Sequence, residues 1–219
     1  MDELDVVPEI NLMPINHKFR ASALQYVGLS SETTDQEVME ALIAIIPCPE
    51  RINDTNRFAS LLADIGDERF IEVLIARIAS AVLGEDFWVA DYMYALINLL
   101  NVGDDYYQVE ESFAHLLGDW LLNTQGGEIS WKAGDILSEV ECPASKDYLL
   151  KGAADSSLFH RTRISCIRGI VNHFREDALS LLRSLEKDSN RDVSEACLDA
   201  MAHLERIERR AQQDAASNR

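Results

Sequence analysis

The residues that could do chemistry are scattered along this chain of 219 residues. The five histidines are His17, His115, His160, His173 and His203, and none of them is followed by a glutamate. A helical two-metal site needs histidine and carboxylate ligands at paired positions, so the sequence predicts no metal site. Glu111 and His115, four residues apart, form the best ligand pair, and such a pair is more typical of a contact on a helix surface.

A nucleophilic thiol is the other chemical candidate. Arg161 and Arg168 flank Cys166, and positive neighbours lower the pKa of a thiol. Apolar residues at helical spacing, such as Ile167 and Ile170, also surround it and indicate a buried core cysteine. The chain has no G-x-S-x-G, Walker or G-x-G-x-x-G motif. We therefore predict no catalytic residue, no cofactor and no small-molecule substrate, and we expect that the protein is not an enzyme.

The composition indicates the cellular compartment and excludes some classes of binding partner. The 20 Lys and Arg residues face 38 Asp and Glu residues, a net charge of -18 that excludes binding to nucleic acid or to an anionic membrane. The start of the chain is acidic, and no run of about 18 apolar residues exists. The four cysteines form no C-x-x-C pair and are typical of a reducing compartment. These features predict a cytoplasmic protein.

Helical periodicity runs through most of the chain. Phe58, Leu61, Leu62 and Ile65 lie on one helix face, and Gly66 then marks a stop. An apolar face of a second helix follows at once, so residues 56–83 predict a helical hairpin. Similar units recur, and their first helices begin near Asn56, Phe87, Ser130, His160 and Asp192. A helical hairpin repeated about every 30 to 45 residues is typical of an α-solenoid.

Two stretches carry a family resemblance. Residues 63–74 (ADIGDERFIEVL) and 188–201 (DSNRDVSEACLDAM) resemble the short HEAT-type repeat found in bilin lyases and many bacterial adaptors. The resemblance implies an all-α fold, a right-handed α-solenoid of about five HEAT-like hairpins with an N-terminal helical cap. We expect an extended segment and capping helices over 1–55, repeats over 56–210 and a polar tail over 211–219, all in one structural domain. The third unit departs from the pattern because it contains Pro143.

The negative charge is concentrated in one part of the chain. Residues 64–141 hold 16 acidic and 3 basic residues, whereas residues 142–219 hold 12 acidic and 13 basic residues. The acidic part also contains all three tryptophans and four of the six tyrosines. Aromatic anchors beside charges are typical of protein-binding surfaces, although the aromatics could equally be core residues. The partner-binding residues that we predict are Glu85, Asp86, Trp88, Asp91, Asp104, Asp105, Tyr106, Tyr107, Glu110 and Glu111.

A surface of this kind fits a basic protein partner. Bacterial immunity proteins neutralise basic toxin domains, often nucleases, and HEAT-like solenoids are one scaffold for that role. We therefore expect a protein-binding solenoid whose acidic, aromatic-rich face captures such a toxin. A general adaptor or assembly factor for a basic protein is the alternative. A HEAT-type enzyme such as a bilin lyase ranks third.

Overall fold

The computed structural model describes residues 14–102, 106–123, 127–173 and 175–217. Over these residues the fold is all-α, with eleven α-helices, one short 3-10 helix at Pro49–Arg51 and two strands of two residues each. The helices are α1 (His17–Val27), α2 (Asp35–Ile45), α3 (Thr55–Ile65), α4 (Arg69–Ala79), α5 (Val89–Leu100), α6 (Glu111–Asn123), α7 (Glu128–Leu137), α8 (Pro143–Ala154), α9 (His160–His173), α10 (Arg175–Leu185) and α11 (Arg191–Ser217). None of them is long and apolar enough to cross a membrane.

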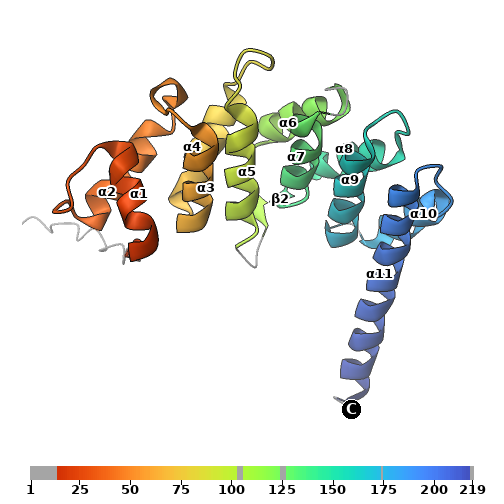
Figure 1. Cartoon of the computed structure of the whole chain (residues 1–219). Coiled ribbons are helices and arrows are strands. Elements are labelled where there is room, and N and C mark those ends of the chain that lie inside the picture. The colour runs from red at the N-terminus through yellow and green to blue at the C-terminus, as the bar shows by residue number, and fades with distance from the viewer. Residues whose placement is uncertain (1–13, 103–105, 124–126, 174, 218–219) are drawn as a thin grey trace, which may run out of the picture.

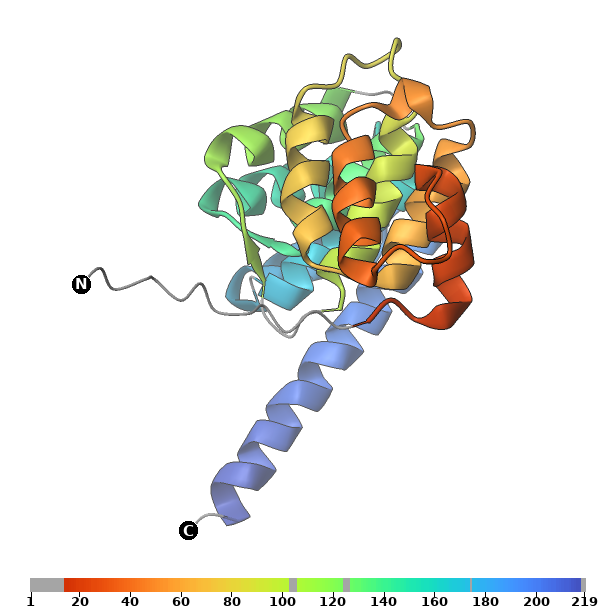
Figure 2. The ribbon, with the colours of Figure 1, turned by 90° about the vertical axis from the view of Figure 1, so that its left-hand side faces the viewer.

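The helices form the HEAT-like solenoid that the sequence predicts. Consecutive helices pair into hairpins that stack side by side from α1 to α11 (Figure 1). Each odd-numbered helix packs against the next odd-numbered helix, and the even-numbered helices form a second layer beside them (Figure 2). Stacking is required because one hairpin cannot bury its apolar face alone.

Local signals explain where the helices begin and end. Thr34 and Glu37 form a capping box at the start of α2, and the Asp54 side chain accepts a hydrogen bond from the Arg57 backbone at the start of α3. Gly66 ends α3 in the left-handed conformation with a φ of 71°. The helix starts expected near Asn56 and His160 are confirmed to within one residue, because α3 begins at Thr55 and α9 at His160.

Both ends of the chain differ in detail from the expectation. In the predicted cap, α1 and α2 form a helical hairpin like those that follow it. The expected extended segment at the start lies almost entirely outside the described residues. At the other end, α11 continues to Ser217 and projects away from the stack (Figures 1 and 2), so most of the predicted tail is helix.

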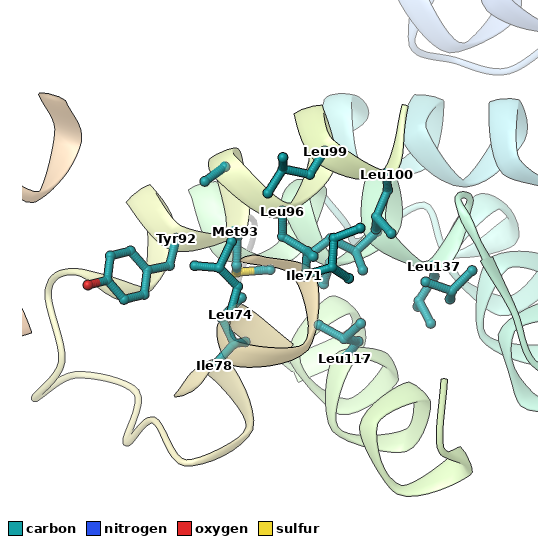
Figure 3. Close-up of a cluster of buried hydrophobic side chains, with 14 of the residues drawn as sticks. Ile71, Leu74, Ile78, Tyr92, Met93, Leu96, Leu99, Leu100, Leu117 and Leu137 are labelled. Atoms are coloured by element: carbon teal, nitrogen blue, oxygen red, sulfur yellow. The ribbon is translucent and has the colours of Figure 1, made fainter. Parts of the chain in front are cut away.

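The core lies between the two layers of helices. Figure 3 shows Leu74 and Ile78 of α4 meeting Met93 and Leu96 of α5, with Leu117 of α6 beside them. Small residues let neighbouring helices approach. A Cβ atom on Gly118 of α6 would come within 2.3 Å of the Tyr148 ring on α8.

Strands β1 (Tyr107–Gln108) and β2 (Val140–Glu141) pair in parallel and join the end of the α5–α6 connection to the end of α7. This link matters for the site because it fixes one of the aromatic residues that the sequence singles out.

Candidate protein-binding turn

Residues 80–88, here called the Phe87 turn, connect α4 to α5 at one end of the helices (Figure 1). The Asp86 carboxylate organises this turn. It accepts a hydrogen bond of 2.8 Å from the Val82 backbone N–H and one of 2.9 Å from the Trp88 indole N–H. The backbone hydrogen bond from Val82 is the largest cause that lowers the pKa of Asp86 below its usual value, and the Trp88 hydrogen bond adds to it. One side chain thus links the two sides of the turn.

Two adjacent aromatic residues of the turn have opposite environments. Trp88 is only 8% exposed, with the Arg77 guanidinium 4.0 Å from its ring centroid and the Tyr92 ring 5.1 Å away. Phe87 is 90% exposed, and Val82 across the turn is 52% exposed. A large apolar side chain held in water by an ordered turn is the strongest indication of a binding site in the described part of the molecule.

The residues predicted to bind a partner in this region therefore have different environments. Glu85 is exposed beside Phe87, as a partner-binding residue should be. Trp88 belongs to the core, and Asp86 stabilises the turn. Sequence reasoning missed Phe87 because helical periodicity places it at the start of α5, where it would be a core residue. No pattern in the sequence separates these two neighbours.

Asp91 joins two helices. Its carboxylate accepts hydrogen bonds from the Thr55 hydroxyl at 2.5 Å and from the Asn56 amide at 3.2 Å. Both donors lie at the start of α3, so Asp91 stabilises the packing of α3 on α5.

Strand β1, which contains Tyr107, pairs with β2 at the end of α5 opposite the Phe87 turn (Figure 1). Asp104 and Asp105 are outside the described residues. Tyr107 lies in β1, where burial raises the pKa of its hydroxyl and the nearby carboxylate of Glu72 raises it further. Tyr106 is exposed, but its hydroxyl donates a hydrogen bond of 3.4 Å to the Asn172 carbonyl oxygen.

Glu110 and Glu111 are both exposed at the start of α6. Glu111 lies 3.6 Å from the imidazole of His115. A helix of the length of α5, about 18 Å, separates the Phe87 turn from β1. The residues predicted as one face are therefore divided among the Phe87 turn, β1 and the start of α6.

Exposed negative charge remains on this part of the solenoid because the few local bases are already engaged. Arg69 pairs with Asp67 at 2.8 Å, Lys132 pairs with Glu128 at 2.6 Å, and Arg77 covers Trp88. Within the described residues, several exposed carboxylates have no Lys or Arg partner. They are Glu68, Glu72, Glu85, Glu110 and Asp119.

The cysteine that the sequence considers as a nucleophile is in the core. Cys166 is fully buried, and this burial raises the pKa of its thiol far above the usual value. The thiol is therefore protonated at neutral pH. Within the described residues, no group of three or more His, Cys, Asp or Glu side chains is placed to hold a metal ion.

Comparison with known proteins adds one structure. No protein family model and no curated protein matches the chain. A solved structure of human deoxyhypusine hydroxylase in complex with glycerol aligns with 86% of this chain and 96% of its own, at 16% identity and a TM-score of 0.35.

That neighbour is an enzyme, which contradicts the expectation that this chain is not one, and the expectation is withdrawn. The likeness is too distant to transfer an activity or a residue role to this chain. The class of protein stands on the fold described above, an all-α HEAT-like solenoid.

Proposed function

We propose that this protein binds a basic partner protein through the Phe87 turn, with Phe87 as the apolar anchor. The observation that carries this proposal is the 90% exposure of Phe87 in a turn that is already ordered. Buried aromatic anchors supply much of the binding energy at protein interfaces. A turn whose backbone is hydrogen-bonded before binding loses less conformational entropy on association than a free loop does.

Charge supports the choice of partner. Glu85 is next to the anchor, and the surrounding segment 64–141 has an excess of 13 negative charges over positive ones. A basic surface would be steered toward this segment, and association would be faster at low ionic strength. A basic protein with an apolar pocket for Phe87 fits both features.

The particular role that we propose is that of an immunity protein against a bacterial toxin with a basic domain. Fast electrostatic capture suits such a role because the toxin must be blocked before it acts. This finer proposal rests on the charge distribution and on analogy with other helical solenoids.

The experiment compares three tagged proteins in a quantitative pull-down from native cells: the wild type, Phe87→Ala and Phe159→Ala. Phe159 is the matched control, because it is also an exposed phenylalanine but lies between α8 and α9, far from the turn. We expect a basic protein that the wild type and Phe159→Ala retain and Phe87→Ala loses. The purified partner should then bind Phe87→Ala about 30-fold more weakly, the loss of a typical anchor.

Equal binding by Phe87→Ala and the wild type would overturn the assignment of the turn. An acidic partner would overturn the charge-driven mechanism. Binding that does not weaken between about 50 and 300 mM salt would overturn it too, because screening of surface charges increases over that range. A partner that is basic but has no toxic activity would leave the binding site standing and exclude the immunity role.

A further inference from the structure

The layer of odd-numbered helices carries a second surface that the proposed function does not use. It comprises Tyr94 on α5, Trp131 on α7, and Arg161, Ile164 and Arg168 on α9, here called the Arg161 patch. These three helices are consecutive neighbours in that layer. The patch spans two turns of α9, about 10 Å from Arg161 to Arg168.

Arg161 is the best-defined residue of the patch. Its guanidinium carbon lies 3.7 Å from the centroid of the Trp131 ring. This distance is typical of a stacked cation–π pair, which holds the guanidinium by its face. In the part of the chain that the structure describes, Arg161 forms no hydrogen bond and no ion pair. Its N–H donors are therefore positioned and available along the edge of the group.

Arg168 supplies a second available cation. It is exposed, and among the described residues it too has no ion pair within 4.0 Å. Asp135 lies within the electrostatic reach of both arginines, but burial raises the pKa of its carboxyl above the usual value. Lys132, nearby on α7, is already paired with Glu128 at 2.6 Å. The two arginines outnumber Asp135, so the patch keeps a positive charge in an otherwise acidic protein.

Apolar surface lies between Arg161 and Arg168, where Ile164 of α9 is half-buried. Tyr94, on the other side of α7, is 41% exposed, and the Lys132 ammonium lies 5.7 Å from the centroid of its ring. The patch thus combines two anion-binding side chains with an apolar side chain between them and an exposed ring at its edge.

We propose that the Arg161 patch binds a short acidic peptide segment of a partner protein. One carboxylate of the peptide would accept two hydrogen bonds from Arg161, another would bind Arg168, and an apolar side chain between them would lie on Ile164. A long polyanion such as nucleic acid fits less well because two arginines neutralise few phosphates and the rest of the chain repels it. A short peptide contacts only the patch, since charges beyond about 8 Å are screened at physiological salt.

The test uses a fluorescein-labelled heptapeptide, Glu-Leu-Glu-Glu-Leu-Asp-Glu, and fluorescence polarisation with the full chain. We expect saturable binding that weakens about tenfold or more in Arg161→Gln and Arg168→Gln. Arg161→Lys keeps the charge but loses the bidentate geometry, so it should fall between the wild type and Arg161→Gln. Arg57→Gln is the matched control, because Arg57 is an exposed arginine of α3 that lies outside the patch, and it should bind like the wild type.

Three results would overturn the proposal: no saturable binding of the acidic peptide, equal weakening in Arg57→Gln, or tighter binding of a Lys-substituted version of the peptide. The melting temperature of each variant, measured in parallel, excludes loss of folding as the cause. Phe87→Ala should bind the acidic peptide normally, so this proposal and the proposed function can fail independently.

Discussion

Two parts of the solenoid use their charged residues in different ways. They are residues 64–141, here called the acidic half, and residues 142–217, here called the balanced half. In residues 64–141 the exposed carboxylates greatly outnumber the bases, and the three bases are held by local contacts. In residues 142–217 the charges are nearly balanced, and one pair is buried. Arg163 donates two hydrogen bonds to the Asp188 carboxylate, at 3.1 and 2.6 Å, and one of 3.1 Å to the Ala153 carbonyl oxygen.

This difference shows what a charge can do in each half. A charge can be buried only when a partner compensates the loss of water, so the balanced half uses Arg163 and Asp188 to join its helices. In the acidic half all three bases are engaged, Lys132 in a buried position beside Glu128, and most of the described carboxylates remain exposed. The following predictions test this contrast, beginning with the largest expected effect.

Removing the buried cation should have the largest effect. Arg163→Ala leaves the Asp188 carboxylate without its partner in a buried site and should lower the free energy of unfolding by about 3–5 kcal/mol. Urea denaturation followed by circular dichroism measures this change. Arg69→Ala, which breaks the more exposed pair with Asp67, should cost only about 0–1 kcal/mol. Equal losses in the two variants would contradict the contrast between the halves.

The adjacent aromatic residues should separate stability from binding. Trp88→Ala removes a buried ring that contacts Arg77 and Tyr92, and it should destabilise the fold by about 3 kcal/mol. Phe87→Ala should change stability by no more than about 0.5 kcal/mol, because its ring is already in water. Thermal melting of both variants measures these changes. A strongly destabilised Phe87→Ala would contradict the exposed position of the Phe87 ring.

Acid should weaken the ion pair between Arg163 and Asp188. The hydrogen bonds from Arg163 lower the pKa of Asp188 in the folded state. A lowered pKa gives stability that is complete above the unfolded value of about 4 and is lost as the pH falls through the folded value. Asp188→Asn should therefore flatten the fall in stability below about pH 4. The hydrogen bonds from Arg69 also lower the pKa of Asp67, so Asp67→Asn should change the profile in the same direction. Unfolding free energies measured at several pH values between about 2 and 6, on both sides of the unfolded-state pKa of Asp, provide the comparison.

The smallest effect on stability is expected at the exposed carboxylates. Glu85→Gln and Glu110→Gln should each change the free energy of unfolding by less than about 0.5 kcal/mol. With the basic partner, Glu85→Gln should slow association at low salt, while Glu110→Gln, next to α6 and outside the Phe87 turn, should slow it less. Stopped-flow association rates measure both. The reverse order would move the binding surface to the start of α6.

Sequence reasoning predicted the fold much better than the site. Apolar spacing such as that of Phe58, Leu61 and Leu62 repeats every helical turn, so it reports the buried face of a helix directly. The predicted site rested on acidic and aromatic residues being close in sequence. Tyr106 and Tyr107 show the weakness of that signal, because one is exposed and the other is held in β1 by pairing with a strand 33 residues away.

The sequence by itself determined the helices, the hairpin repeat and the half of the chain that carries the negative charge. These follow from local periodicity and from composition, which tertiary contacts do not change. Only the tertiary structure decided that Trp88 is buried and Phe87 exposed, and that Arg161 is stacked and available while Arg163 is buried. Each outcome depends on a residue from another segment: Arg77 covers Trp88, Trp131 supports Arg161 and Asp188 neutralises Arg163.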